Sequence, residues 1–182
     1  MDNWNDILNR FLIQTQSNDL KYSSYPKNWS DLILRISFGM GVPARVPWIA
    51  FITEDMKVSE GFYPVYLFYK ETNTLILAYG ISETMQYSKT WPEEILSSNI
   101  TLKKYFNKKI PRYGDSFVFK AYKVKILNNK IEFQDPESQT KITEETIKKD
   151  LQNLIENYKK ILLIKTSTVT PNLQGVFYME KQ

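Results

Sequence analysis

The sequence predicts a single α+β domain, and three observations carry that prediction. Its 182 residues suit one domain of ordinary size. With 42% hydrophobic and 14% aromatic side chains, the composition is that of a folded chain rather than a disordered one. Helical patterns lie near both ends, and mostly alternating strand patterns lie between them. We therefore expect a bent, mostly antiparallel sheet resembling a half-barrel, flanked by an N-terminal helix, short inserted helices and a long C-terminal helix.

The first quarter of the chain predicts a helix, a loop and a strand. Apolar side chains recur at helical spacing over residues 4–16, which indicates an amphipathic helix. Residues 17–27 are polar and typical of a loop. Apolar residues then recur at every second position over residues 32–38, the period of a strand with one buried face.

A tight turn follows that first strand. Gly39 and Gly41 flank Met40, and their conformational freedom allows a turn that projects from the sheet. Pro43 and Pro47 then bracket a short segment. We expect the next strand to begin directly after it.

Three strands are predicted in the middle of the chain, over residues 48–53, 62–69 and 74–81. The last two are separated by a connection of hairpin length. Proline followed by two acidic residues at positions 92–94 indicates the start of a short helix, because acids stabilise the positive end of the helix dipole. Another short helix is expected over residues 100–108.

The last third predicts a hairpin and the long helix. Strands are expected over residues 116–126 and 130–133, joined by a two-asparagine turn. A helical apolar face covers residues 144–162, and Thr143 suits its N-cap. We therefore expect five to seven strands in one domain over residues 1–182, with a core over about 4–163. Residues 164–182 are expected to form a tail or an edge strand.

Composition excludes several kinds of chemistry. The chain has no cysteine and no histidine, so disulfides, thiolate catalysis, the usual zinc, copper and haem sites and Ser–His–Asp triads are absent. Neither the phosphate-binding loop of nucleotide hydrolases nor the glycine pattern of dinucleotide-binding folds occurs. We expect no catalytic residue, no metal and no cofactor. The N-terminus lacks the pattern of a signal peptide, so a cytoplasmic location is expected.

One acidic motif leaves a nuclease as a distant alternative. Residues 54–57, Glu-Asp-Met-Lys, follow a predicted strand and contain the acids and the lysine of a magnesium-dependent nuclease. No earlier Pro-Asp pair supplies the missing metal ligand. A charged turn at the end of a strand is the simpler interpretation.

Positive charge is concentrated in one segment. The formal net charge is +4, yet residues 101–130 contain nine basic side chains and a single acid, Asp115, for a net charge of +8. Such a segment beside aromatic residues is the pattern expected for contact with phosphates. A solvated surface in a lysine-rich protein is the alternative interpretation.

The aromatic residues suggest what else could bind. Strand 62–69 has two faces, and one of them would present Tyr63, Leu67 and Tyr69. Most of the aromatic side chains belong to the core. An aromatic pocket beside a basic surface would nevertheless suit a nucleobase extruded from a duplex. A protein- or peptide-interaction domain using the same aromatic face is the alternative.

Several segments in a fixed order carry a resemblance to a known family. They are Tyr25-Pro26, Leu34–Gly41, Val46–Phe51, Gly61–Lys70, Leu77–Ser82, Tyr105-Phe106, Arg112–Ser116 and Tyr158-Lys159. Together these segments resemble the N-terminal DNA-binding domain of McrB, the modified-cytosine restriction endonuclease subunit. The resemblance covers about residues 4–163.

The resemblance implies a reader of modified DNA. Domains of that family bind double-stranded DNA containing C5-modified cytosine and flip the base into a pocket. In the family, a GTP-hydrolysing AAA+ motor follows this domain, uses GTP and Mg²⁺, and works with the separate nuclease subunit McrC. The sequence here contains no motor domain, so the resemblance implies the target-recognition module of a phage-defence restriction system and not an enzyme.

The resemblance also assigns individual residues. The two planes that hold the flipped base match Trp48 and Tyr113 here, and Leu67 matches the residue at the modified edge of the base. Tyr63 matches an aromatic near the pocket. Met40 stands where the family has a tyrosine that fills the gap left in the duplex. An apolar methionine is a known type of wedge, although it stacks less flatly than tyrosine.

Further residues complete the expected interface. Additional DNA-binding positions are Ser37, Gly39, Gly41, Arg45, Lys103 and Lys104. Candidate phosphate contacts beyond these are Lys108, Lys109, Lys123 and Lys125, and Arg35 with Arg45 is the alternative footprint if the lysines do not face DNA.

Overall fold

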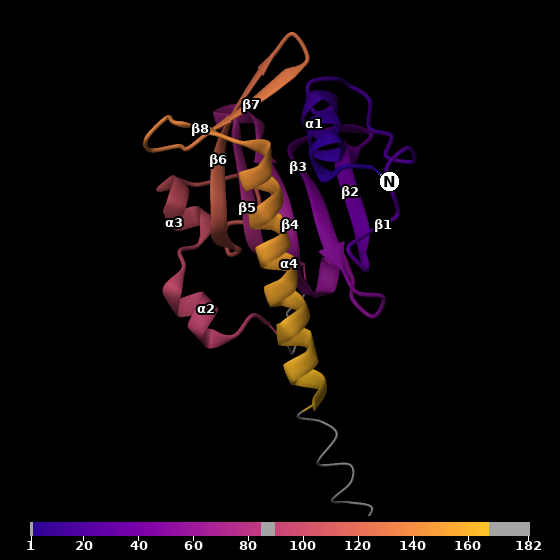
Figure 1. The fold of residues 1–182 in the computed structure, drawn as a ribbon, viewed down its shortest axis with the longest axis vertical. Helices are drawn as coiled ribbons and strands as arrows, with labels where there is room; N and C mark the ends of the chain where they lie inside the picture. The colour runs from indigo at the N-terminus through magenta and orange to yellow at the C-terminus, as the bar shows by residue number, and fades with distance from the viewer. Residues whose placement is uncertain (1, 85–89, 168–182) are drawn as a thin grey trace, which may run out of the picture.

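The computed structural model describes residues 2–84 and 90–167 and has the predicted α+β architecture. These residues form one open sheet of eight strands, each antiparallel to its neighbour in sequence (Figure 1). The strands are β1 (Asn28–Trp29), β2 (Leu32–Met40), β3 (Val42–Ile52), β4 (Phe62–Tyr69), β5 (Thr74–Ile81), β6 (Phe117–Leu127), β7 (Lys130–Gln134) and β8 (Lys141–Ile142). The sheet is therefore a simple meander, and it is antiparallel throughout.

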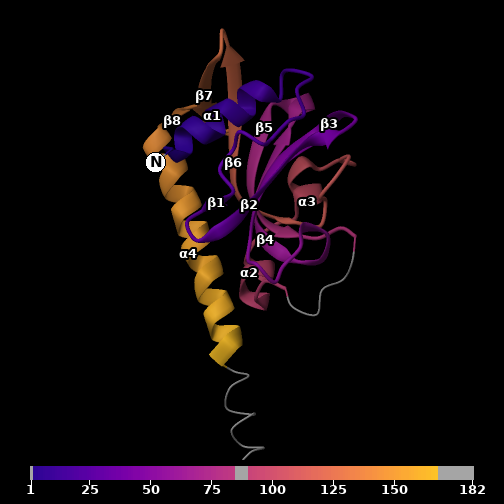
Figure 2. The same ribbon diagram turned by 90° about the vertical axis from the view of Figure 1, so that its right-hand side faces the viewer.

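The helices lie on both sides of this sheet. They are α1 (Trp4–Gln14), α2 (Glu93–Ser98), α3 (Leu102–Phe106) and α4 (Glu144–Ser167), with short 3-10 turns η1 (Val58–Glu60) and η2 (Lys70–Thr72). Seen from the side, α4 and α3 are on opposite sides of the sheet (Figure 2). Within the described part of the chain, no helix is long and apolar enough to cross a membrane.

One face of the sheet is packed against the two long helices. Trp4 of α1 stacks on Tyr66 of β4 with ring centroids 5.7 Å apart. The Tyr158 ring of α4 meets Phe62 edge-on at 5.7 Å, and the Tyr158 hydroxyl donates a hydrogen bond to the Phe62 carbonyl at 2.9 Å. Because strand side chains alternate, Tyr63 lies on the opposite face.

That opposite face is covered by shorter elements. Trp48 of β3 is the cross-strand partner of Leu67 in β4, so both side chains lie on this face. Phe106 of α3 packs on Tyr69 of β4, with ring centroids 4.6 Å apart. The segment from α3 to β6 crosses the same face and brings Tyr113 over it. The residues predicted to bind DNA are therefore on the side away from α1 and α4.

The prediction for the start of β3 was wrong. The strand begins at Val42, not at Trp48, and contains both prolines. Its pairing with β4 covers Trp48 to Ala50, while residues before Trp48 pair with β2 alone and across a register shift. Proline is tolerated there because a strand segment with one free edge does not need every N–H in the ladder.

The remaining differences concern the ends of elements. The sheet exceeds the expected five to seven strands because β1 and β8, of two residues each, were not predicted. Helix α3 is shorter than expected because Asn107 adopts a left-handed conformation that ends it. Helix α4 continues through residues 164–167, where a tail or edge strand was expected. The rest of that expected segment, residues 168–182, lies outside the described residues.

Candidate nucleic-acid interface

Three of the predicted aromatic residues meet around one cavity. Trp48, Tyr63 and Tyr113 line it, although they come from β3, β4 and the segment before β6. Its other lining residues are Val58, Val65, Gly80, Ile81 and Ser116. The cavity measures about 10 Å³, which is about the space that one water molecule needs. A nucleobase would enter only after one of the rings has moved.

The strand register places Tyr63 and Val65 beside Gly80 at one wall of the cavity. Tyr63 of β4 lies opposite Gly80 of β5, two positions along the strand from Val65, which lies opposite Ala78. A Cβ atom on Gly80 would lie 2.6 Å from the Tyr63 carbonyl oxygen and 2.8 Å from a methyl group of Val65. Glycine at position 80 therefore keeps the cavity wall free of a side chain.

The two strand aromatics differ in exposure. Trp48 is half-buried, whereas Tyr63 is 4% exposed and its hydroxyl donates a hydrogen bond to the Val58 carbonyl at 2.6 Å. Burial raises the pKa of Tyr63, so its ring stays neutral at physiological pH. Leu67 lies directly across from Trp48 but is fully buried and is not among the residues that line the cavity.

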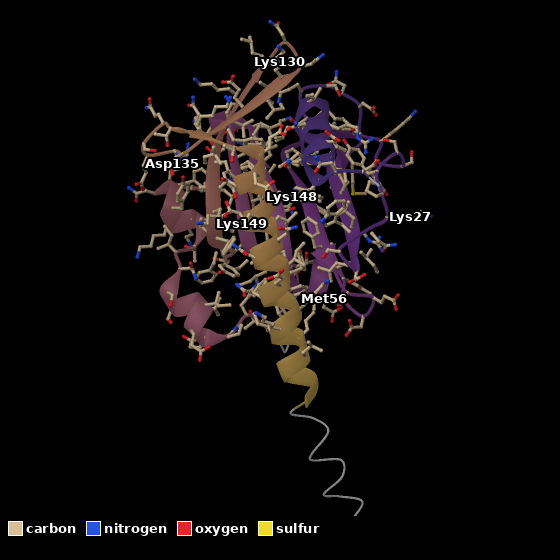
Figure 3. All side chains as sticks on the ribbon, viewed as in Figure 1. Lys27, Met56, Lys130, Asp135, Lys148 and Lys149 are labelled. Carbon is tan, nitrogen blue, oxygen red and sulfur yellow. The ribbon has the colours of Figure 1, made fainter. Side chains whose placement is uncertain are left out.

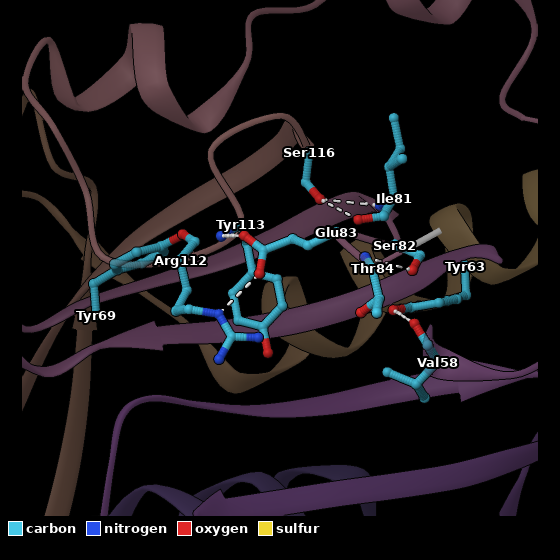
Figure 4. A network of polar contacts seen from close by, with 10 residues as sticks. All are labelled: Val58, Tyr63, Tyr69, Ile81, Ser82, Glu83, Thr84, Arg112, Tyr113 and Ser116. Carbon is cyan, nitrogen blue, oxygen red and sulfur yellow. Dashed lines mark hydrogen bonds and ion pairs between the residues drawn. The ribbon is translucent and has the colours of Figure 1, made fainter. Parts of the chain in front are cut away.

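Tyr113 forms the outer wall of the cavity and belongs to a loop. Its backbone has a φ of +65°, in the left-handed region that non-glycine residues seldom occupy. Glu83 accepts hydrogen bonds from the Tyr113 backbone N–H and, at 2.8 Å, from Nε of Arg112 (Figure 4). Burial raises the pKa of the Tyr113 hydroxyl to about 12, against the opposing effect of the Arg112 charge. The ring is therefore uncharged where it would face a base.

The predicted turn around Met40 forms the tip of the β2–β3 hairpin. Gly39 has a φ of +121°, and a Cβ atom there would lie 2.1 Å from the Val42 carbonyl oxygen, so this position requires glycine. Gly41 also has a positive φ of +72°. The tip presents two apolar side chains to solvent, Met40 at 92% exposure and its cross-strand partner Val42 at 70%.

The hairpin tip is tied to the cavity through β2. Ser37, three residues before Met40, is the cross-strand partner of Trp48. The Ser37 hydroxyl accepts a hydrogen bond from the Gly39 backbone N–H at 3.3 Å. At about 3.3 Å per strand residue, Met40 lies roughly 10 Å along β2 from the position opposite Trp48.

Basic residues surround a second hollow on the sheet face that carries Trp48 and Leu67. The residues that line it include Arg45, Lys70, Lys108, Lys109 and Tyr69. The Tyr69 hydroxyl donates a hydrogen bond to the Arg112 carbonyl at 2.8 Å. Arg45 forms an exposed ion pair with Glu71, and the hydrogen bond from Arg45 lowers the pKa of that carboxyl group.

The basic segment does not form one patch. Lys103 lines a further hollow with Lys108 and Lys109, and Lys104 is exposed on the same short helix. Lys130, by contrast, lies at the tip of the β6–β7 hairpin (Figure 3). Lysines also occur on the opposite face, where Lys148 is carried by α4 (Figure 3).

The acidic motif considered for a nuclease lies at the turn after β3. Thr53 donates a hydrogen bond to the Asp55 carboxylate at 2.6 Å. Across residues 2–84 and 90–167, no cluster of three or more acidic side chains is arranged to hold a metal ion. The motif is a charged turn at the end of β3.

Sequence reasoning missed three residues of the site. Val42 adds to the apolar hairpin tip, Gly80 keeps the cavity wall open, and Glu83 holds the Tyr113 loop. Val42 was detectable as an apolar residue beside a glycine turn. Gly80 and Glu83 gave no local signal, because their partners Tyr63 and Tyr113 are 17 and 30 residues away in the sequence.

Comparison with known proteins relates the chain to a relative and to a family. The chain is 35% identical over 124 residues to the type IV methyl-directed restriction enzyme EcoKMcrB subunit of Escherichia coli (strain K12). That alignment covers 64% of the chain but 26% of the relative, so the chain spans about a quarter of the relative's length. The model of the MrcB-like, N-terminal domain family matches residues 8–163, which include the cavity, the hairpin tip and the basic residues. The chain therefore belongs to the MrcB-like N-terminal domain family.

Proposed function

We propose that this chain reads modified cytosine in duplex DNA by flipping the base between Trp48 and Tyr113. One observation carries the proposal: Trp48 and Tyr113 line the same cavity although they lie 65 residues apart in sequence. Two aromatic planes on either side of a base contribute stacking energy of about 1–3 kcal/mol per base. An uncharged tyrosine and a tryptophan provide such planes without repelling the phosphates.

The closed cavity implies that the pocket opens when the base enters. A volume of about 10 Å³ holds no base. Trp48 is fixed between two strand neighbours, Ser37 and Leu67. Tyr113 is on a loop and is the wall that we expect to move. In the opened pocket, Leu67 would approach the C5 substituent of the base, where burial of a methyl group contributes about 0.8 kcal/mol.

The hairpin tip supplies the wedge that base flipping requires. Extruding a base costs a few kcal/mol in lost pairing and stacking. The exposed side chain of Met40, with Val42 beside it, would enter the duplex at the vacated position and recover part of that loss. The glycines at positions 39 and 41 allow the hairpin to present these side chains.

Basic side chains on the same face would contact the phosphates. Arg45, Lys108 and Lys109 surround the hollow beside Tyr69, and Lys103 and Lys104 extend this surface along α3. These contacts would bind DNA regardless of sequence and would bring the cavity to the duplex. This surface favours a DNA ligand over a peptide, because a peptide would not require it.

The wider role follows from the relative's description as part of a methyl-directed restriction enzyme. We propose that the chain is the target-recognition module of such a system, without catalysis of its own. In a longer parent protein it would act beside a GTP- and Mg²⁺-dependent motor ring and the McrC nuclease subunit.

A titration of methylated and unmethylated duplexes at two salt concentrations tests the proposed function. The wild-type chain should prefer the methylated duplex, and Trp48→Ala should weaken that binding tenfold or more while the circular-dichroism spectrum is unchanged. Trp29→Ala is the matched control, since Trp29 is also half-buried but packs against Trp4 of α1. A wild-type chain that binds both duplexes equally, or a Trp48→Ala variant with unchanged affinity, would contradict the proposal.

A further inference from the structure

The conformation of Tyr113 requires support from elsewhere in the molecule. A left-handed backbone conformation is energetically disfavoured for tyrosine. In this loop the positive φ belongs to Tyr113 and not to the neighbouring Gly114. Such a conformation persists only where surrounding contacts determine it. The contacts of this loop therefore decide where the Tyr113 ring stands.

Glu83 provides the central contact. One oxygen of its carboxylate accepts the backbone N–H of Tyr113, and the other accepts Nε of Arg112 at 2.8 Å (Figure 4). One side chain thus holds the main chain of the aromatic residue and the side chain of its neighbour. Glu83 is 32% exposed and Arg112 58%, so the pair is at the surface beside the cavity.

Arg112 transmits this restraint to the aromatic ring. Its guanidinium carbon lies 4.9 Å from the centroid of the Tyr113 ring, in cation–π contact. The Arg112 carbonyl accepts the Tyr69 hydroxyl at 2.8 Å, so the backbone is held from β4 as well. The ring, the guanidinium and the carboxylate form one connected unit.

Glu83 is itself fixed by the end of the β4–β5 hairpin. The neighbouring Ser82 donates its backbone N–H to the Gly61 carbonyl at 2.9 Å and its hydroxyl to the Ser59 carbonyl. Ser116 accepts the Ile81 N–H at 3.0 Å and joins this end of β5 to the start of β6. The carboxylate therefore projects from an anchored point, which lets it set the position of a loop 30 residues away.

The charge of Glu83 has the wrong sign for a DNA contact. A carboxylate near phosphates repels them, so an acid on this face that served only electrostatics would weaken binding of every duplex. Removing it would then strengthen binding to methylated and unmethylated DNA alike. A carboxylate that holds one wall of the base pocket predicts a different result, because its removal would weaken recognition of the flipped base.

We infer that Glu83 is a positioning residue that, through Arg112 and the Tyr113 main chain, holds the Tyr113 ring as the outer wall of the base pocket. This inference rests on the proposed function, since it names what holds the movable wall of the same pocket in place. It assigns selectivity for the modified base to an acid that does not touch DNA.

The test compares substitutions of two acids, Glu83 and Glu71, that are each paired with an arginine. Glu83→Gln and Glu83→Ala should lower the ratio of methylated to unmethylated affinity, by about tenfold for alanine and less for glutamine, whose amide oxygen still accepts one N–H. Glu71→Gln is the matched control, because Glu71 pairs with Arg45 and does not contact Tyr113. It should leave the ratio unchanged. An unchanged ratio in Glu83→Ala, with a wild-type chain that does prefer methylated DNA, would overturn the inference.

Amide hydrogen exchange without DNA supplies a second readout. Exchange of the Tyr113 amide should become faster in Glu83→Ala and stay at the wild-type rate in Glu71→Gln. An unchanged Tyr113 exchange rate in Glu83→Ala would overturn the inference even if affinity changed. A wild-type chain without preference for methylated DNA would contradict the proposed function instead, and the exchange rate would still decide whether Glu83 holds the loop.

Discussion

The two aromatic walls of the cavity are held in place by different means. Trp48 lies in a strand between Ser37 and Leu67, and the hydrogen bonds of the sheet fix its backbone on both sides. Tyr113 lies in a loop with a left-handed backbone and depends on the Glu83 carboxylate. Moving the Trp48 main chain would break hydrogen bonds of the sheet, whereas the Tyr113 main chain is held by its N–H bond to Glu83 and by the Ser116 N–H bond to its carbonyl. The comparison indicates that the pocket has one fixed wall and one adjustable wall.

The largest effect on the free energy of unfolding is expected at the fixed wall, where Leu67 packs across from Trp48. Leu67→Ala should lower the free energy of unfolding by about 2–5 kcal/mol, because Leu67 is fully buried behind Trp48 and its loss leaves a cavity in the sheet face. Denaturant unfolding measures the change. Leu127→Ala, at a side chain that is 73% exposed, should change stability little and serves as the control. A loss for Leu67→Ala as small as that of the control would show that this wall is not rigidly packed.

Leu67 also allows a test of methyl reading that keeps the fold intact. Leu67→Val removes a single methylene, and we expect it to lower the methylated-to-unmethylated affinity ratio by about fourfold, the equivalent of one buried methylene. Fluorescence anisotropy with the two duplexes measures the ratio. If the ratio stays at the wild-type value, Leu67 supports Trp48 but does not contact the C5 substituent.

We expect the hairpin tip to contribute through the duplex and not through the pocket. Met40→Ala should reduce affinity for a fully paired methylated duplex by roughly three- to tenfold, and by less when the target base is mispaired, because less pairing and stacking must then be broken. Met40→Tyr, which restores the family's residue, should tighten binding. A 2-aminopurine beside the target base reports extrusion by its fluorescence. Equal losses of affinity on paired and mispaired duplexes would contradict a wedge role for Met40.

The left-handed backbone conformation of Tyr113 can be tested in variants that lack the aromatic ring. Tyr113→Gly and Tyr113→Ala both delete the aromatic plane, but glycine accepts the left-handed conformation that alanine resists. The glycine variant should therefore be more stable than the alanine variant by about 1 kcal/mol. Thermal unfolding followed by circular dichroism compares the two. Equal stability would mean that the loop changes its backbone conformation when the ring is removed.

The smallest effects are expected at the lysines. Lys108→Gln should lower the slope of log affinity against log salt by about 0.9 if Lys108 contacts one phosphate of a duplex. Lys148→Gln on α4, on the opposite face, should leave the slope unchanged (Figure 3). A change at Lys148 with none at Lys108 would place the DNA on the helical face, away from both aromatic walls.

Much of the fold could be predicted because its signals are local. The bounds of β4 and β5 were predicted without error, since both are continuous strand patterns ended by turn residues. The Asn128-Asn129 turn is confirmed by a positive φ at both residues. The two-residue strands β1 and β8 could not be predicted, because strands so short exist only through pairing with β2 and β7.

The residues of the candidate site came from the resemblance, whereas their arrangement came from the fold. The resemblance predicted that Trp48 and Tyr113 hold the base and that Tyr63 lies near the pocket, and the structure places all three around one cavity. That this cavity is closed, and that Leu67 does not line it, follows from packing between β3, β4 and a loop. No local pattern encodes such a volume.

The sequence by itself determined the order of the longer strands and of the helices, the glycine-dependent hairpin tip around Met40, and the absence of cysteine and histidine chemistry. Each of these depends on residue type or on neighbours within a few positions. The tertiary structure alone decided that Glu83 meets Arg112 and Tyr113, and that Gly80 leaves Tyr63 room at the cavity wall. The physical reason is that a hydrogen bond or a steric contact forms between any atoms that the fold brings together, and sheet pairing brings together residues far apart in the chain.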